Sequence, residues 1–220
     1  MEWEFHVLYG IQNLFGSPWM DQIMLWLSFL GDKGGFWIIL ALCLLVRKST
    51  RKMGLVMAAA LVIDLVLTNG FLKPLVARTR PFVTAGVSLL VPPPTDGSFP
   101  SGHTAASFAA DMSLWFMKSR LAKPALLLAA LIAFSRLYLF VHYPTDIAGG
   151  ILSGTLAAYA AWKLVGRSIW DWKRLRHQRL CIRIGGTPFF SCILEDLKCV
   201  KAETAVPVLF PQRKQLRVKN

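Results

Sequence analysis

The chain has 220 residues, enough for one domain of ordinary size, and 55% of them are hydrophobic. Its formal net charge at pH 7 is +13, which in a soluble domain would indicate binding to nucleic acid. Of the 25 basic residues, however, 13 lie at or beyond Lys163 and seven more lie in two short clusters, 47–52 and 118–123. Such clusters are typical of cytoplasmic segments in membrane proteins, so we expect membrane lipids and no nucleic acid as partners.

Residues 1–17 are predicted to form an amphipathic helix at the membrane interface, because apolar residues recur at four-residue spacing from Trp3 to Phe15. Further helices are predicted at 19–30, 36–47, 53–74, 103–117, 123–141 and 144–165.

The apolar stretches are separated by short charged clusters, as in a chain that crosses a membrane several times. A transmembrane helix takes about 20 residues, and 55–72 is almost unbroken apolar sequence. We therefore expect an all-α fold, a polytopic membrane bundle of about five to six transmembrane helices. The predicted organisation is an interfacial helix over 1–17, a membrane domain over 18–165 and a basic cytoplasmic tail over 166–220.

Three short motifs lie at the ends of apolar stretches. They are Lys73-x6-Arg80-Pro81, Pro100-Ser101-Gly102-His103 and Ser135-Arg136-x5-His142-x3-Asp146. The cations of the first and third motifs suit a phosphate group, and the planar guanidinium donors of Arg80 and Arg136 fit its oxygens best.

The second motif reads as the start of a helix. Ser101 is a good N-cap residue, and Gly102 lets a ligand approach the backbone. Unpaired backbone N–H groups and the helix dipole at such an end attract anions. We expect Ser101 both to cap the helix and to bind phosphate, with His103 beside it.

The third motif places a histidine and a carboxylate one helical turn apart. His142 precedes Pro144, which suits a first helical turn, and Asp146 follows His142 by four residues. A carboxylate there can hold one ring nitrogen, fix the tautomer and leave the other nitrogen free to attack.

The order and spacing of the three motifs resemble the type 2 phosphatidic acid phosphatase (PAP2) family, whose fold is shared with vanadium haloperoxidases; the resemblance covers about residues 18 to 165. It implies that His142 is the nucleophile and forms a phosphohistidine, that Asp146 orients it, and that His103 is the general acid. It assigns phosphate binding to the remaining motif positions: Lys73, Arg80, Ser101, Gly102 and Arg136. No metal or other cofactor is implied.

The resemblance implies a hydrolase for a lipid phosphate or diphosphate in the cell membrane. Within the family, small bacterial members of this kind resemble undecaprenyl-diphosphate phosphatases. Phosphatidylglycerophosphate and phosphatidic acid remain open as alternative substrates. Transfer of the phosphoryl group to a lipid or sugar hydroxyl, and a non-catalytic scaffold or transporter, also remain open. The composition disfavours a soluble haloperoxidase. Oligomeric state is not predicted.

Alternating helices would place both basic clusters and the tail on one side of the membrane and the three motifs on the other. The positive-inside bias then predicts an extracytoplasmic active site and a cytoplasmic C-terminus. Of the five other basic residues, Lys33 alone lies away from the motifs. Arg78 is expected either to assist phosphate binding or to reach the membrane interface, and Asp64 to face away from Lys73 in a helix-packing contact.

Overall fold

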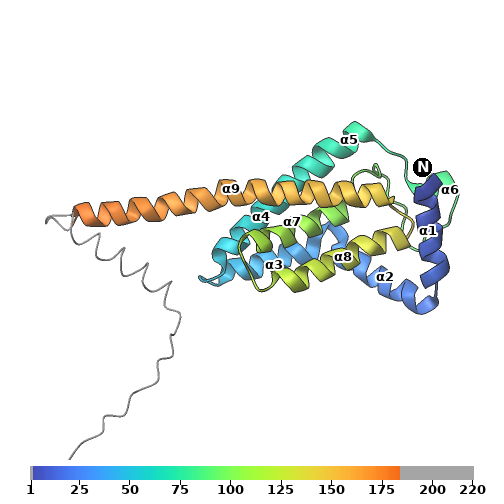
Figure 1. The fold of residues 1–220 in the computed structure, drawn as a ribbon, viewed down its shortest axis with the longest axis horizontal. Coiled ribbons are helices and arrows are strands. Elements are labelled where there is room, and N and C mark those ends of the chain that lie inside the picture. The colour runs from blue at the N-terminus through green and yellow to red at the C-terminus, as the bar shows by residue number, and fades with distance from the viewer. Residues whose placement is uncertain (1, 184–220) are drawn as a thin grey trace, which may run out of the picture. The chain divides into compact units, whose positions relative to one another are not determined.

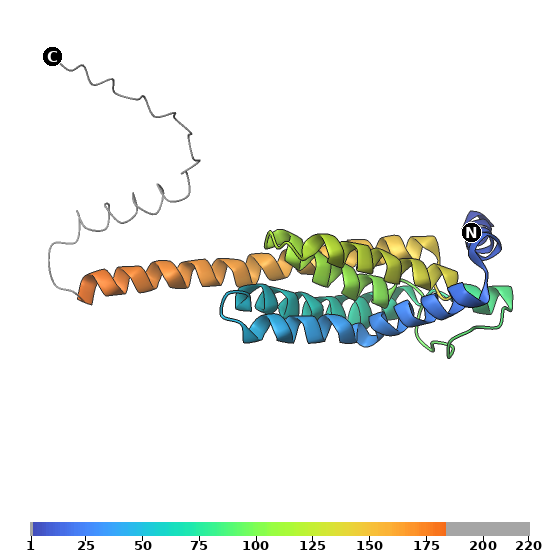
Figure 2. The same cartoon turned by 90° about the horizontal axis from the view of Figure 1, so that it is seen from below.

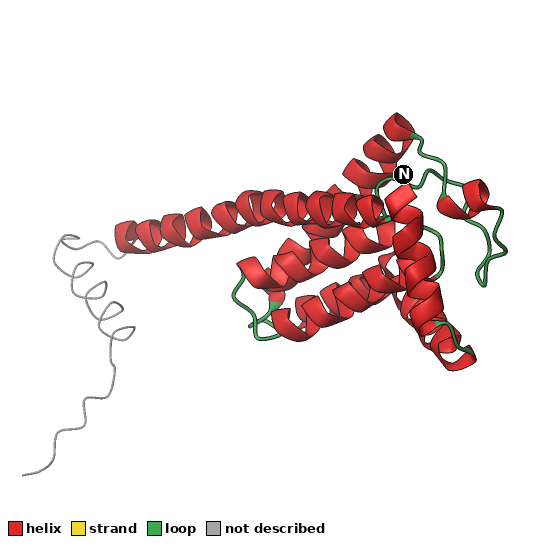
Figure 3. Ribbon diagram, turned by 45° about the vertical axis from the view of Figure 1, so that its right-hand side comes forward, coloured by secondary structure: helices red, strands yellow, loops and turns green. Residues whose placement is uncertain are grey.

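The computed structural model describes the backbone of residues 2–183 and the side chains of residues 2–165. The chain divides into two compact units, 1–170 and 171–220, and the helical bundle belongs to the first. Over the described residues the fold is helical, without strands (Figure 3). The elements in chain order are α1 (Glu2–Phe15), α2 (Pro18–Gly31), η1 (Asp32–Gly34), α3 (Gly35–Val46), α4 (Arg51–Asp64), η2 (Leu65–Leu72), α5 (Lys73–Val76), α6 (Pro81–Ala85), α7 (Gly102–Phe116), α8 (Ala122–Tyr138) and α9 (Pro144–Arg183).

Helix α7 lies at the centre of the bundle, and its small side chains let its neighbours approach closely. Ala105, Ala109 and Ala110 are completely buried. A Cβ atom built on Gly154 of α9 would lie 2.2 Å from the carbonyl oxygen of Ala105, and one on Gly150 would lie 2.8 Å from that of Ser101. Helices in membranes pack through such small residues. This close contact brings the start of α9 against the start of α7.

The two ends of the bundle differ in character. The loops α3–α4 and α7–α8, which carry the two basic clusters, lie together at one end (Figures 1 and 2). The loops that carry the three motifs, between α5 and α7 and between α8 and α9, lie at the other end. The predicted separation of the basic clusters from the motifs is therefore present in the fold.

The outer surface is apolar along two stretches long enough to cross a membrane, Pro18–Val46 and Arg51–Ala85. Large side chains such as Trp26 and Phe29 are exposed there, as lipid-facing residues would be. The predicted number of five to six spans is not confirmed, since α7 has 15 residues and α8 has 17, below the length of a perpendicular span.

Several predicted boundaries differ from the structure. The segment predicted as one helix over 53–74 consists of α4, the π-helical η2 and α5, and the short helix α6 was not predicted. Helix α8 ends at Tyr138, earlier than predicted, whereas α9 continues to Arg183, beyond the predicted end at residue 165. The part of the predicted tail beyond residue 183 lies outside the described residues.

Candidate active site

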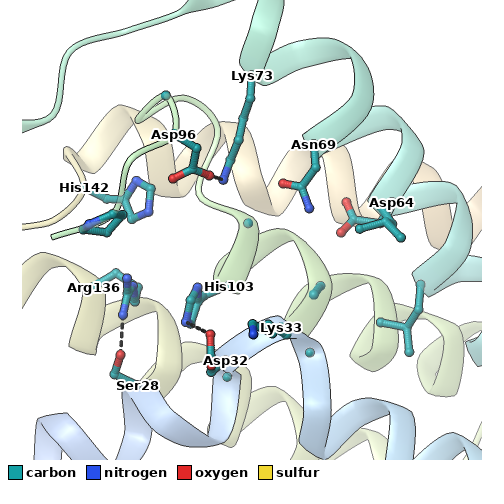
Figure 4. A pocket seen from close by; sticks show the side chains of 18 of the residues that line it. Ser28, Asp32, Lys33, Asp64, Asn69, Lys73, Asp96, His103, Arg136 and His142 are labelled. Carbon is teal, nitrogen blue, oxygen red and sulfur yellow. Dashed lines mark hydrogen bonds and ion pairs between the residues drawn. The ribbon is translucent and has the colours of Figure 1, made fainter. Parts of the chain in front are cut away.

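A cavity of about 1530 Å³ opens at the motif end of the bundle. Figure 4 shows side chains from η1, η2, α5, α7 and the α8–α9 turn converging on it. Six of the eight predicted site residues line this cavity: Lys73, Arg80, Gly102, His103, Arg136 and His142. Asp146 and Ser101 do not line it and lie behind it, both completely buried.

His142 lies in the turn between α8 and α9 and is almost completely buried. Its Nε2 atom is 3.2 Å from Nη1 of Arg80, and its Nδ1 atom is 3.5 Å from Oδ2 of Asp146. Arginine can only donate, so Nε2 carries the lone pair and the proton lies on Nδ1, facing the carboxylate. Burial lowers the pKa of His142 to about 4, although Asp146 opposes this. The ring is therefore neutral near pH 7, and Nε2 can attack a phosphorus atom once its lone pair is released from Arg80.

Asp146 is held by donors on both oxygens. Its Oδ2 atom accepts hydrogen bonds from the hydroxyl of Ser98 and, at 2.9 Å, from the backbone N–H of Tyr143. Its Oδ1 atom accepts from Nη1 of Arg78 at 2.7 Å. These bonds fix the carboxylate behind His142, but the 3.5 Å separation from the ring is longer than the predicted hydrogen bond.

Arg78 holds the back of the site together. In addition to Asp146, it donates to Oε2 of Glu4 at 2.7 Å, and its guanidinium lies 4.0 Å from the centre of the Tyr143 ring. Oε1 of Glu4 accepts from the hydroxyl of Thr145 at 2.6 Å. The prediction that Arg78 reaches out to the membrane interface was therefore wrong, because its side chain points inward to Asp146 and Glu4. The sequence also gave no sign that Glu4, in the first helix, would be buried beside Asp146.

Asp96 occupies the space between two of the predicted phosphate-binding cations. Its Oδ1 atom accepts from Nη2 of Arg80 at 2.6 Å, and its Oδ2 atom accepts from the ammonium group of Lys73. Burial alone would favour the neutral acid, but the hydrogen bonds and charges of Lys73 and Arg80 outweigh it and lower the pKa of Asp96 to about 2. A carboxylate thus occupies donors of two residues that the sequence predicts to bind phosphate. Sequence reasoning treated Asp96 only as a turn residue.

Arg136 and His103 face the cavity from α8 and α7. Arg136 is buried and donates to the hydroxyl of Ser28, but its Nε atom has no hydrogen-bond partner within the described part of the chain. An unsatisfied buried donor costs about 1–3 kcal/mol, which an anionic ligand would recover. Nε2 of His103 lies 4.0 Å from Oδ1 of Asp32. Ser28 and Asp32 belong to none of the three motifs, and no spacing in the sequence linked them to the site.

The start of α7 differs in detail from the prediction. Ser101 occupies the N-cap position, but its hydroxyl makes no capping bond and instead accepts from the hydroxyl of Thr104 at 3.0 Å. The predicted side-chain cap was therefore wrong. Gly102 does line the cavity: a Cβ atom there would lie 3.5 Å from Nζ of Lys73, within ordinary contact distance.

The π-helical η2 corrects the prediction for Asp64. In a regular α-helix Asp64 and Lys73 would face nearly opposite directions, but both line the cavity, as does Asn69 (Figure 4). Hydrogen bonds of the i→i+5 type add about one residue to each turn, which rotates Lys73 back toward the face of Asp64. Wider, π-helical turns of this kind occur often at functional sites.

The arrangement can carry out phosphoryl transfer. It offers a neutral imidazole as nucleophile, a second imidazole across the cavity, and three cations that can stabilise charge on a phosphoryl group. Within the described residues, no three or more of His, Cys, Asp and Glu gather in a way that could hold a metal ion.

Comparison with known proteins agrees with this chemistry. Residues 49–170 match the PAP2 superfamily. The undecaprenyl-diphosphatase BcrC of Bacillus subtilis is 29% identical over 159 residues, covering 70% of this chain and 79% of that protein. An undecaprenyl-diphosphatase of Sulfolobus acidocaldarius is 32% identical over 154 residues, 69% of this chain and 74% of that one.

Among solved structures, LpxE of Aquifex aeolicus superposes with a TM-score of 0.64 and 27% identity, over 72% of this chain and 94% of that one. The residues that match the family, 49–170, include all three motifs. The chain belongs to the PAP2 superfamily and is a phosphoric ester hydrolase.

Proposed function

We propose that the protein is a metal-independent lipid phosphatase that works through a phosphohistidine and whose physiological substrate is undecaprenyl diphosphate. The observation that carries the mechanism is the position of His142, with one ring nitrogen facing Asp146 at 3.5 Å and the other facing the cavity, 3.2 Å from Arg80. The names of the relatives with about 30% identity support the substrate.

In the first step, Nε2 of His142 attacks the terminal phosphorus as its bond to the bridging oxygen breaks. Lys73, Arg80 and Arg136 bind the non-bridging oxygens, and Arg136 has a buried Nε–H free to do so. His103 gives a proton to the departing oxygen, and the bound phosphate dianion favours the protonated form of this ring through its opposite charge. The products are the lipid monophosphate and phosphohistidine.

In the second step, water attacks the phosphorus and the P–N bond breaks. His103, now neutral, accepts the proton of the water, and inorganic phosphate leaves. Asp146 stabilises the positive charge that His142 carries while phosphorylated. Asp96 must leave Lys73 and Arg80 for substrate to enter, because its carboxylate holds the same donors.

We further propose that the site faces the extracytoplasmic side. The basic loops at the opposite end of the bundle support this orientation through the positive-inside bias. Single cysteines at Thr95 and Ser49, in a chain whose native cysteines are replaced by serine, would test it with an impermeant maleimide on intact cells. Labelling at 95 and not at 49 is expected; the reverse pattern would overturn the orientation.

The function is tested by phosphate release from purified protein in detergent and EDTA. The lipid panel holds undecaprenyl diphosphate, phosphatidylglycerophosphate and phosphatidic acid, and His142→Ala is the control. We expect the wild-type protein to release phosphate from undecaprenyl diphosphate and His142→Ala to release none. We also expect an acid-labile phosphoprotein to be trapped in the wild type. Activity that EDTA abolishes, or that survives in His142→Ala, would contradict the mechanism. If the protein prefers another lipid of the panel, that lipid would replace undecaprenyl diphosphate as the proposed substrate.

A further inference from the structure

Lys33 is an exposed residue in the wall of the cavity. It belongs to η1, which interrupts the candidate membrane span Pro18–Val46 near its middle. Its backbone is left-handed, with φ 49° and ψ 18°, a conformation that few residues other than glycine adopt. Charged residues within membrane segments face cavities and are commonly functional, and backbone strain of this kind persists where the surroundings impose it.

The surroundings of η1 explain why the strain persists. A Cβ atom on Gly31 would lie 2.7 Å from Cγ2 of Ile132 and 3.0 Å from Cδ2 of His103, so the chain passes directly against α8 and α7. The turn that follows brings Asp32 and Lys33 to the wall of the cavity. Figure 4 shows Lys33 beside Asp32, whose carboxylate points to His103.

Lys33 differs from the other cations of the cavity in having no partner. Within the described residues its ammonium group makes no hydrogen bond or ion pair, whereas Lys73 and Arg80 bind Asp96 and Arg136 binds Ser28. Because Lys33 is exposed at the cavity and unpaired, its ammonium group is available to an anionic group of a bound ligand.

The position of Lys33 identifies the part of the substrate that it can reach. The transferred phosphoryl group must lie at His142, between Lys73 and Arg80, and the leaving oxygen must lie toward His103, which protonates it. In a lipid diphosphate the leaving oxygen carries a second phosphate group, whereas in a lipid monophosphate it carries an uncharged carbon. Asp32, 4.0 Å from His103, would by itself repel a second phosphate. Lys33 is the adjacent charge that can compensate.

Resting on the function proposed above, we propose that Lys33 binds the second phosphate group of a lipid diphosphate and so makes the enzyme select diphosphates over monophosphates. The η1 segment then forms a leaving-group subsite next to His103. Lys73, Arg80 and Arg136 bind the transferred phosphoryl group. Lipid diphosphates and monophosphates both carry this group, so these three residues cannot discriminate between the two classes of substrate.

The test compares farnesyl diphosphate with farnesyl phosphate, which share one tail, as substrates of the purified protein. The measured quantity is the ratio of their kcat/KM values in wild type, Lys33→Asn, Lys33→Arg and the control Lys48→Met. Asparagine adopts the left-handed conformation more readily than lysine, so Lys33→Asn removes the charge while relieving strain. Lys48 lies in the loop between α3 and α4, at the other end of the bundle.

We expect Lys33→Asn to lower the ratio by about tenfold or more, the usual cost of losing a charge-assisted hydrogen bond, with thermal stability unchanged or raised. Lys33→Arg and Lys48→Met should keep the ratio near that of wild type. A purely structural role would instead lower both kcat/KM values together. An unchanged ratio in Lys33→Asn, with diphosphate hydrolysis intact in wild type, would overturn this inference alone. Absence of diphosphate hydrolysis in wild type would overturn the proposed function and the inference with it.

Discussion

The carboxylate of Asp96 accepts a hydrogen bond at 2.6 Å from the guanidinium of Arg80, one of the cations proposed to bind the phosphate of the substrate. The same carboxylate holds the ammonium group of Lys73 and is half-exposed at the cavity. The empty site is therefore partly neutralised by its own loop, and any phosphate that binds must compete with this internal anion.

Replacing Asp96 with Asn should tighten the binding of inorganic phosphate, because the amide keeps the shape of the side chain and removes its charge. Since Asp96 is half-exposed, solvent screening limits the gain to about three- to tenfold. The measurement is the inhibition constant of phosphate against lipid substrate, with the exposed acid variant Glu2→Gln as control. An inhibition constant that stays the same or rises in Asp96→Asn would show that this carboxylate does not compete with phosphate.

His142 should stay neutral well below the ordinary histidine pKa, because burial lowers its pKa to about 4. The folded state then binds fewer protons than the unfolded state between about pH 4 and 6.5, so the stability that comes from this residue is complete above pH 6.5 and is lost as pH falls toward 4. A titration of the ring nitrogens by NMR checks this, with His142→Ala used to assign the signals. A midpoint near 6.5 would contradict the burial argument.

Replacing Glu4 with Ala should reduce kcat more than it changes KM, because Glu4 supports Asp146 through Arg78 and does not line the cavity. Leaving a buried partner unsatisfied costs about 1–3 kcal/mol, so the midpoint of thermal unfolding should fall as well. Glu2→Ala, on the same helix but exposed, should change neither quantity. An effect confined to KM would show that Glu4 acts on substrate binding instead.

Adding a methyl group at Gly154 should destabilise the bundle. The new Cβ would lie 2.2 Å from the carbonyl oxygen of Ala105, so α7 and α9 would have to separate, at a cost of about 1–3 kcal/mol. Gly10 has nothing within 4 Å of the corresponding position, so Gly10→Ala serves as the matched control and should be neutral or slightly stabilising. Thermal unfolding in detergent measures both variants, and equal midpoints would contradict the close packing of α7 and α9.

The sequence predicted which local residues lie together in the site, because this depends on spacing within one helix or turn, but it did not predict their hydrogen bonds, such as the missing side-chain cap at Ser101. Asp146 follows His142 by four residues, and the start of α9 places it behind the ring. Lys73 and Arg80 are also close in sequence and meet at the same cavity. The predicted helices correspond to observed ones because long apolar runs leave little choice of secondary structure.

Contacts between distant segments could not be predicted in this way. Asp96 and Lys73 are 23 positions apart in a segment that includes α5 and α6, and Glu4 and Arg78 are 74 positions apart. The π-helical turns of η2 have no signature in composition, yet they decide that Asp64 and Lys73 line the same cavity. Such features depend on how the helices pack, which periodicity alone does not specify.

The chain of contacts from Glu4 through Arg78 to Asp146 has a consequence for how the enzyme senses its surroundings. Because Glu4 of the first helix binds Arg78 and Arg78 binds Asp146, the proposed role of Asp146 predicts that turnover depends on the attachment of this helix to the bundle. Detergents or lipids that pull this helix away should lower turnover without touching the cavity. The lipid environment would then act as an effector of the enzyme as well as the source of its substrate.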